Sequence, residues 1–216
     1  MVEFTFWDIA RHLLMALRWT VGLSLIAFAC GSVLALALLV LRLSKLPGAV
    51  RAVACFVQIF QGTPLLMQLF LIYFGLAMLG VETSPLLAAS VCLTLYASAY
   101  LCDIWRGCVE SVPKGQWEAS ASLALSFGEQ LRHVILPQAM RLGIAPTAGF
   151  MVQIIKGTAL TSVIGFVEVT KAGQLIANAT FEPFLIYGCV ALMYFALCFP
   201  LSLWSQRLER RLRPAS

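Results

Sequence analysis

Five long apolar stretches dominate the pattern of hydrophobic and polar positions along the chain. As helices, all five are long enough to cross a hydrocarbon core of about 30 Å. Polar and charged residues gather in the segments between them. The pattern therefore predicts an all-α integral membrane protein with five transmembrane helices. These lie at about 19–41, 53–79, 86–105, 143–166 and 184–206.

The first eighteen residues differ from these stretches because charged positions alternate with apolar ones at helical spacing. Asp8, Arg11 and Arg18 oppose an apolar face. This pattern is typical of a helix that lies in the membrane interface. We therefore expect an amphipathic helix over residues 1–18 that leads into a transmembrane domain over 19–216. Its apolar face is formed by Phe4, Trp7, Leu14 and Leu17.

The second apolar stretch is interrupted at residues 62–64, which read Gly-Thr-Pro. A break inside a membrane frees backbone groups that protein or cavity water must satisfy, and broken helices often line transport paths. Gln58, Gln61 and Gln68 lie near this break. They are candidates for contact with a polar solute, and hydrogen bonding between helices is the alternative.

The connector over 111–137 is the longest run in which no membrane span is plausible. Pro113 suits the first turn of a helix, and the alanines and serines that follow keep that helix thin. Ser126 and Glu129 match the S-x-x-E capping box, which starts a second helix. Pro137 is expected to end or kink the second helix.

Composition agrees with a membrane protein and excludes several other classes. Hydrophobic residues make up 61% of the chain and charged residues 12%, with a mean hydropathy of +0.90; soluble domains are far less apolar. The net charge of +5 is better explained by loop arginines than by nucleic-acid binding. The seven cysteines lie in or beside apolar runs without a C-x-x-C pair, and His12 and His133 are isolated. We therefore expect no metal site.

The positions of Lys and Arg predict the orientation, because positive charge collects on the cytoplasmic side. If the N-terminus is outside, the inner segments hold eleven of these residues and the outer segments three, with Lys156 inside a span. We therefore expect an N-terminus outside, a cytoplasmic C-terminus and a cytoplasmic 111–137 connector. The connections near 80–85 and 167–183 are then short outer loops. The eleven are Arg42, Lys45, Arg51, Arg106, Lys114, Arg132, Arg141, Arg207, Arg210, Arg211 and Arg213, and the three are Arg11, Arg18 and Lys171.

The connector carries a recognisable motif. E-A-S-x-x-x-A from Glu118 to Ala124, followed by V-I-L-P up to Pro137, resembles the EAA loop of bacterial ABC importer permeases. Further stretches at 61–76, 100–120, 159–176 and 181–212 are similar to the polar amino-acid branch, which includes the histidine, glutamine and arginine permeases. The resemblance covers nearly the whole chain from about residue 15.

This resemblance implies the type I ABC importer permease fold and an inner-membrane translocation subunit. ATP and Mg would be bound by a partner ATP-binding subunit dimer, since the chain has no G-x-x-x-x-G-K-[ST] motif and needs no cofactor itself. The other implied partners are a second permease, identical or homologous, a substrate-binding protein outside, and membrane lipid. The EAA loop, about 107–141, would form a coupling helix that docks on the ATPase. Its candidate contact residues are Gly115, Glu118, Ala119, Ser120, Ala124 and Gly128.

Polar residues inside the predicted spans are candidates for a substrate path, because such residues are costly in a membrane unless they serve a function. Lys156 is the one cation deep in a span. It could contact a substrate carboxylate or a gate residue, snorkel to the inner surface, or form a structural pair with Asp103, which is our expectation. Asp103 could instead pair with Arg106. The candidates are Gln58, Gln61, Thr63, Pro64, Gln68, Tyr100, Asp103, Gln153, Lys156 and Thr158.

Several positions depart from the family pattern, and they leave the substrate open. Ala124 replaces a usual glycine and Ser120 an alanine, while Gln58 and Gln61 stand where many relatives have a Glu and an Arg. Asp103 and Gly157 likewise replace a frequent Glu and Asp. The expected function is import of a polar amino acid. A modified amino acid such as an opine is the alternative, and an ion-driven secondary transporter or a membrane enzyme finds less support because coupling or catalytic residue sets are missing.

Overall fold

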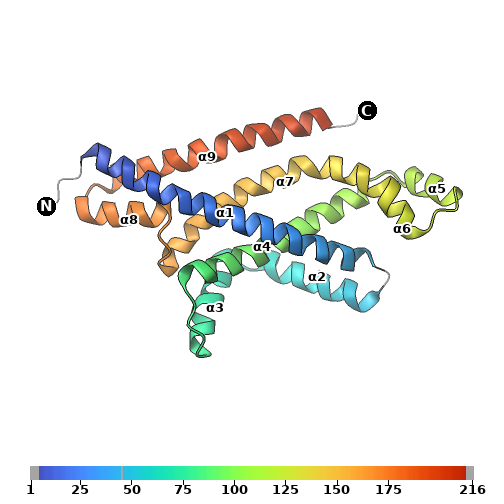
Figure 1. Cartoon of the computed structure of the whole chain (residues 1–216), viewed down its shortest axis with the longest axis horizontal. Helices are drawn as coiled ribbons and strands as arrows, with labels where there is room; N and C mark the ends of the chain where they lie inside the picture. The colour runs from blue at the N-terminus through green and yellow to red at the C-terminus, as the bar shows by residue number, and fades with distance from the viewer. Residues whose placement is uncertain (1–4, 45, 213–216) are drawn as a thin grey trace.

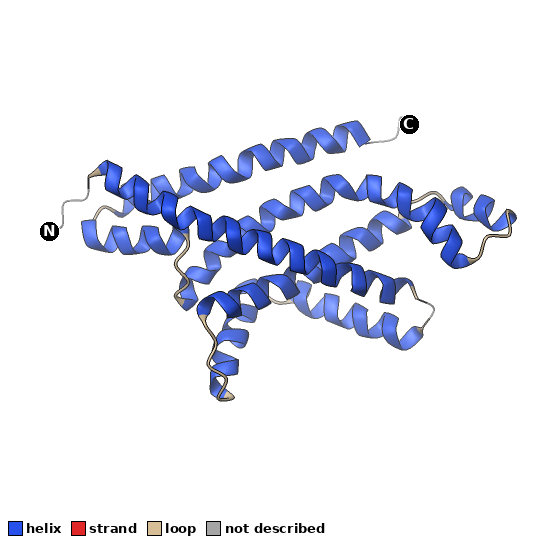
Figure 2. Ribbon diagram, viewed as in Figure 1, coloured by secondary structure: helices blue, strands red, loops and turns tan. Residues whose placement is uncertain are grey.

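A computed structural model describes residues 5–44 and 46–212, and within them the chain is helical without strands (Figure 2). Short connections join the helices, several of which start at a proline, where the missing N–H costs little. The helices are α1 (Phe6–Leu43), α2 (Pro47–Gly62), α3 (Leu65–Met78), α4 (Pro85–Glu110), α5 (Lys114–Ser122), α6 (Phe127–Glu129), the π-helix η1 (Gln130–Ile135), α7 (Leu136–Thr158), the 3-10 helix η2 (Ala159–Ile164), α8 (Val169–Thr180) and α9 (Pro183–Leu212).

Long helices aligned with the longest axis build the body of the protein (Figure 1). Helices α1, α4 and α9 run in one direction, and α2 and α7 return in the other. Four helical stretches of the described chain are long and apolar enough to cross a membrane, and the bent pair α2–α3 gives a fifth if it counts as one span. The predicted all-α membrane fold is confirmed, with the break in the second span at the expected residues.

The break is sharper than an ordinary proline kink. The chain bends by 103° between α2 and α3 at Thr63 and Pro64. Helix α3 therefore projects from the body as a separate arm (Figure 1). At 1.5 Å per residue, the 16 residues of α2 extend about 24 Å and the 14 residues of α3 about 21 Å. Neither half alone reaches the full thickness of a hydrocarbon core.

The most extensive contact in the body lies between α1 and α4. A buried stripe of small residues runs along α1 at intervals of three and four: Ser24, Ala27, Gly31 and Ala35. A methyl group on Gly31 would lie 2.6 Å from the Ala97 Cβ of α4. Small residues let helix backbones approach closely in membranes, where van der Waals packing and not the hydrophobic effect drives association.

Helix α1 is continuous from Phe6 to Leu43, so no break separates the predicted amphipathic helix from the first span. Its 38 residues extend about 57 Å, well beyond a hydrocarbon core. One face of the N-terminal part, formed by Ile9, Leu13 and Ala16, packs against α8 and α9. Trp7 and Leu14 are exposed on another face, where lipid contact stays a prediction; Phe4 lies outside the described residues.

The segment over 167–183, expected to be a short outer loop, contains the helix α8; its outer location stays a prediction. Apolar residues at 169, 172, 176 and 177 form one buried face of that helix. Gly173 lies so close to α9 that a methyl group there would be 2.5 Å from Val190. The periodicity of these positions is visible in the sequence, but the segment was too short to register as a span.

The α1–α4 contact yields a stability prediction. Gly31→Val inserts a branched side chain where no space exists, and overpacking of this kind costs about 1–3 kcal/mol. The variant should therefore unfold at a lower temperature in detergent, as followed by tryptophan fluorescence. Gly22→Val on the same helix is the matched control, since a methyl group there meets no atom within 4 Å. Equal melting temperatures for the two variants would contradict this packing.

Candidate functional site

The predicted coupling segment forms a compact tip at one end of the molecule. Helices α5 and α6 lie beyond the ends of α4 and α7, opposite the end that carries α8 (Figure 1). The segment is joined directly to these two long helices, so a push on the tip acts on both of them.

Hydrogen bonds and packing make this tip rigid. The predicted capping box is confirmed, because the Ser126 amide and hydroxyl both donate to the Glu129 carboxylate at 2.8 and 2.7 Å. The rings of Trp117 and Phe127 stack with centroids 6.2 Å apart, which ties α5 to α6. A small core formed by Cys108, Val109, Val112, Ile135 and Ala139 fixes the segment to α4 and α7.

Five of the six predicted coupling residues lie on the surface of this tip, and one does not. Ser120 is only 2% exposed, and its hydroxyl donates to the Trp117 carbonyl at 2.9 Å. Its small size therefore suits packing inside the tip. The exposed residues are Gly115, Glu118, Ala119, Ala124 and Gly128.

Of the two alternatives for Pro137, an end or a kink of the second helix, the structure excludes the end. The chain passes from the π-helix η1 directly into α7, with Pro137 in the first turn of α7. A π turn places the hydrogen bond one residue further along, so the missing N–H of the proline is accommodated without a break. The fourth long helix therefore begins well before residue 143.

The break between α2 and α3 is closed by one side chain. The amide nitrogen of Gln68 lies 2.9 Å from the Phe60 carbonyl, 3.0 Å from the Thr63 carbonyl and 2.9 Å from the Thr63 hydroxyl. The Thr63 hydroxyl in turn donates to the Ile59 carbonyl at 2.7 Å. Gln68 is 6% exposed, so the side chain is committed to the break, while its Oε1 has no hydrogen-bond partner.

The remaining candidates of the second span are on the surface. Gln58, Gln61 and Pro64 are exposed, and within the described residues no hydrogen bond joins the two glutamines. Their amide groups are therefore accessible to a second protein chain or a polar solute. Pro64 is the first residue before α3 and accepts two amide bonds of its first turn through its carbonyl.

A stack of rings joins α4 to α7 near the centre of the molecule. Tyr100, Tyr96 and Phe150 contact one another, with centroid distances of 4.6 Å (Tyr96–Tyr100), 5.4 Å (Tyr100–Phe150) and 6.1 Å (Tyr96–Phe150). Gln153 of α7 is exposed and lies beside Tyr96 of α4. Thr158, by contrast, is fully buried, and its hydroxyl donates to the Ile155 carbonyl at 2.7 Å. The stack and Gln153 can face a path, whereas Thr158 is part of the core.

The expected pair between Lys156 and Asp103 is wrong. Asp103 pairs with Arg106 at 3.0 Å, and the described residues hold no ion pair of Lys156. Leu93 of α4 lies next to Gly157, because a methyl group on Gly157 would lie 3.6 Å from the leucine side chain. Asp103 is ten residues further along α4 than Leu93, which is about 15 Å at 1.5 Å per residue. The two charges therefore lie at different depths.

Lys156 instead lines a groove between α7 and α9 of about 260 Å³. The ammonium side chain is exposed there, facing Tyr194, Cys198 and Ser202 of α9. The surrounding wall is largely apolar. An unpaired cation in such a place attracts a carboxylate, because the charge is costly when it faces an apolar surround alone.

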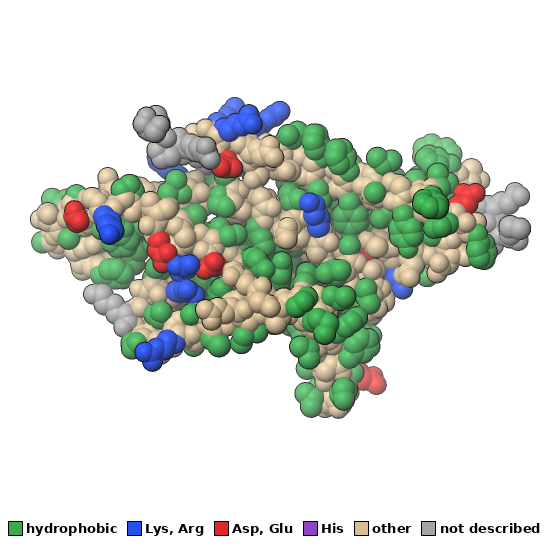
Figure 3. Space-filling view, turned by 180° about the vertical axis from the view of Figure 1, so that it is seen from behind, with side chains coloured by type: hydrophobic (Ala, Val, Ile, Leu, Met, Phe, Trp, Pro, Cys, Tyr) green, Lys and Arg blue, Asp and Glu red, His purple; other side chains and the backbone are tan. Residues whose placement is uncertain are grey.

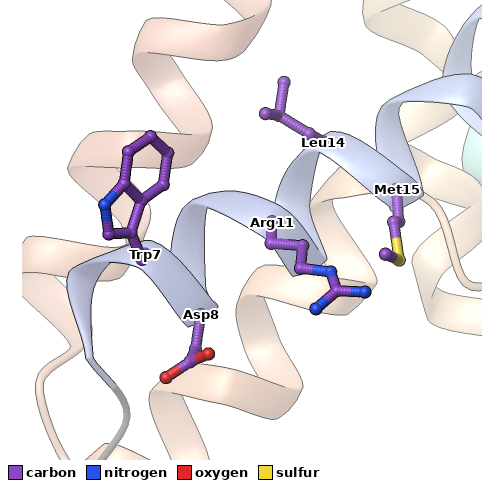
Figure 4. A pocket seen from close by; sticks show the side chains of 5 residues that line it. All are labelled: Trp7, Asp8, Arg11, Leu14 and Met15. Carbon is purple, nitrogen blue, oxygen red and sulfur yellow. The ribbon is translucent and has the colours of Figure 1, made fainter.

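A larger open pocket of about 550 Å³ lies elsewhere, on the N-terminal turns of α1. Trp7, Asp8, Arg11, Leu14 and Met15 line it and project outward from one helix (Figure 4). Because α1 alone supplies the lining, this pocket is a shelf on the surface, and we assign it no function.

Charge and apolar surface are unevenly distributed over the molecule. In the view from behind, Lys and Arg side chains gather over the half that carries α5 and α6, whereas apolar side chains cover the projecting arm (Figure 3). Large exposed apolar residues of the arm include Met67, Leu71, Phe74 and Met78. The exposed apolar surface of the arm is typical of a surface that contacts lipid or another protein chain.

The profile of the family described as "Binding-protein-dependent transport system inner membrane component" matches residues 30–214. The chain belongs to this family. Members are permease subunits that work with an ATP-binding subunit and a substrate-binding protein. This permease therefore shares the general role of the family. The apolar helices of its described residues agree with a multi-pass inner-membrane protein.

Individual relatives cover nearly all of this permease. The L-cystine transport system permease protein TcyB of Bacillus subtilis is 35% identical over 98% of this chain and 90% of its own. The glutamine transport system permease protein GlnP of Escherichia coli is 38% identical over 73% of each chain. Among solved structures, an amino acid ABC transporter with histidines has a TM-score of 0.90 at 28% identity, covering 97% of this chain and 100% of that chain.

A second solved structure supports the fold alone. The inward-facing MetNI methionine ABC transporter has a TM-score of 0.72 at 21% identity, covering 98% of this chain and 99% of that chain. The type I importer permease fold is thereby confirmed.

The structure of the permease also shows residues that the sequence reasoning missed. Leu123 is 74% exposed at the end of α5, beside the small residues on the surface of the tip. Glu168, which follows the 3-10 helix η2, is fully buried. Its signal in the sequence is a carboxylate directly before an amphipathic segment, the position of a helix cap.

Ala124 gives a prediction for the turn after α5. Its φ of 56° lies in the left-handed region, which costs a residue with a Cβ about 1 kcal/mol or more. Ala124→Gly should therefore raise the melting temperature of the purified permease, because glycine adopts this conformation without that cost. Ala121→Gly inside α5 is the control and should lower it. A lower melting temperature for Ala124→Gly would show that the turn is unstrained.

Proposed function

We propose that this permease imports a polar amino acid across the inner membrane and that the α7–α9 groove contacts its carboxylate through Lys156. The observation that carries the proposal is the unpaired Lys156 side chain in a groove of about 260 Å³. The relatives named above give the substrate class, since their names specify cystine and glutamine transport. A free amino acid always carries a carboxylate, so one lysine can serve the whole class.

We further propose that the α5–α6 tip docks on a dimer of ATP-binding subunits, which bind ATP and Mg. The support is its rigidity and its exposed small residues, with Glu118 and Leu123 at the surface. Rigid-body movement of a packed element can carry force across an interface. Because α4 and α7 join the tip directly, movement of the tip would shift Lys156 relative to α9.

The proposed arrangement in the membrane places the tip and the C-terminus in the cytoplasm and the N-terminus outside. The gathering of Lys and Arg over the tip half supports it (Figure 3). A binding protein would then deliver the amino acid at the end that carries α8. A second permease, identical or homologous, would cover part of the apolar surface, with membrane lipid around the rest.

Lys156→Met tests the groove. Methionine keeps most of the length of the side chain but removes the charge, and a hydrogen bond to a charged group contributes about 1.5–3 kcal/mol. Uptake of radiolabelled glutamine, cystine and arginine by the reconstituted transporter should fall about tenfold or more for the transported amino acid. Lys171→Met is the control, since Lys171 bonds to Gln174 on α8 and lies outside the groove. Undiminished uptake by Lys156→Met with normal assembly would exclude the contact.

Glu118→Lys tests the docking tip. A reversed charge on the exposed face of α5 should weaken docking without unfolding the permease, because Glu118 is solvent-exposed. Both uptake and ATP hydrolysis stimulated by the binding protein should fall severalfold. Glu82→Lys, an equally exposed glutamate before α4, should leave both unchanged. Normal stimulated hydrolysis in Glu118→Lys would place the docking surface elsewhere.

A further inference from the structure

Glu168 is the one fully buried charged side chain in the described part of the chain. No cation faces it there. Burial raises the pKa of its carboxyl group above the ordinary value, and hydrogen bonds from Thr170, Tyr194 and Lys171 oppose that rise. A carboxylate without a counter-ion is costly to bury, so its surroundings point to a specific purpose.

The carboxylate caps α8 and ties it to two neighbouring helices. One oxygen accepts from the Lys171 amide at 2.9 Å and the other from the Thr170 amide at 2.8 Å. The Tyr194 hydroxyl of α9 donates to the second oxygen at 2.8 Å. From α1, the Thr20 hydroxyl lies 3.5 Å from that oxygen and accepts from the Val169 amide at 3.3 Å.

Tyr194 belongs to both this cluster and the groove. Its hydroxyl holds Glu168, while the residue also lines the cavity that contains Lys156. Cys198, one turn further along α9, lines the same groove as Lys156. A molecule that enters the groove therefore meets the side chain that holds the cap of α8.

Apart from this cap, close packing against α9 holds α8 in place. A methyl group on Gly173 would lie 2.5 Å from the Val190 side chain, so the backbone of α8 at Gly173 packs directly against a side chain of α9. A change at Tyr194 is then transmitted by displacement of α8 as a unit, since the cap and the Gly173 contact act on the same short helix of 12 residues.

We propose that Tyr194 and Glu168 are positioning residues that couple occupancy of the Lys156 groove to the position of α8, at the end of the molecule opposite the docking tip. This inference rests on the proposed function for the groove. It assigns to α8 the role of an element that responds to the cargo, and it assigns to the Tyr194 hydroxyl a role in coupling and not in cargo affinity.

The first experiment needs no cargo. Hydrogen exchange of peptides from α8 is compared in the full permease and in Tyr194→Phe, which removes one hydroxyl only. Loss of a bond to a charged group should speed exchange at the capped amides of Thr170 and Lys171 about tenfold. Tyr187→Phe is the matched control, because Tyr187 is exposed on the same helix. Unchanged α8 exchange in Tyr194→Phe would overturn the link.

The second experiment measures transport by the reconstituted complex with its ATP-binding subunit, using the amino acid that the wild type takes up. Tyr194→Phe and Glu168→Gln should each lower the maximal rate about fivefold, in the range of typical coupling between sites, with KM within twofold of the wild type. A raised KM with an unchanged maximal rate would make Tyr194 a cargo contact and overturn the proposal.

The two proposals can fail separately. If the wild-type complex takes up no amino acid, the proposed function fails, while the exchange result on α8 stands. If Lys156→Met loses uptake and Tyr194→Phe keeps both the rate and the α8 protection, the groove is functional and the coupling is refuted. Should Glu168→Gln fail to fold, Tyr194→Phe decides alone, because it leaves the cap of α8 in place.

Discussion

The structure depends on one constraint: a backbone group that leaves a helix within an apolar environment must find another partner. Two side-chain arrangements meet this constraint at the places where the helices break or start. Gln68 and Thr63 take up the free carbonyls at the α2–α3 break, and Glu168 takes up free amides at the start of α8. Each set of hydrogen bonds stabilises an abrupt change in the direction of the chain, which apolar packing alone would not stabilise.

The long helices connect the α5–α6 tip at one end of the molecule with the groove between α7 and α9. The tip formed by α5 and α6 is stiff, and α4 and α7 extend from it to the ring stack of Tyr100 and Phe150. The groove lies beyond that stack, against α9. In the proposed function, force applied at the tip would reach the groove through α4 and α7.

Much of this architecture is readable from the sequence because its strongest signals are long and local. Apolar length revealed the long helices, residues 62–64 the break, and Ser126 with Glu129 the capping box. The errors concern relations between distant segments. Lys156 and Asp103 were matched by charge, but only the α4–α7 register shows that they lie at different depths. The helix α8 was not predicted because its 12 residues are too few for a span, and the burial of Glu168 depends on contacts with α1 and α9 that lie far away in the sequence.

The π-helix between the tip and α7 has a consequence for how the two can move. A π turn holds one residue more than an α turn, so Gln130–Ile135 contains a surplus of chain within an unbroken helix. Moving that surplus past one residue turns that residue by about 100°, the angle between successive residues at 3.6 per turn, while the helical segments on either side keep their relative rotation. The joint can therefore re-aim single side chains of η1 without turning α7 against the tip.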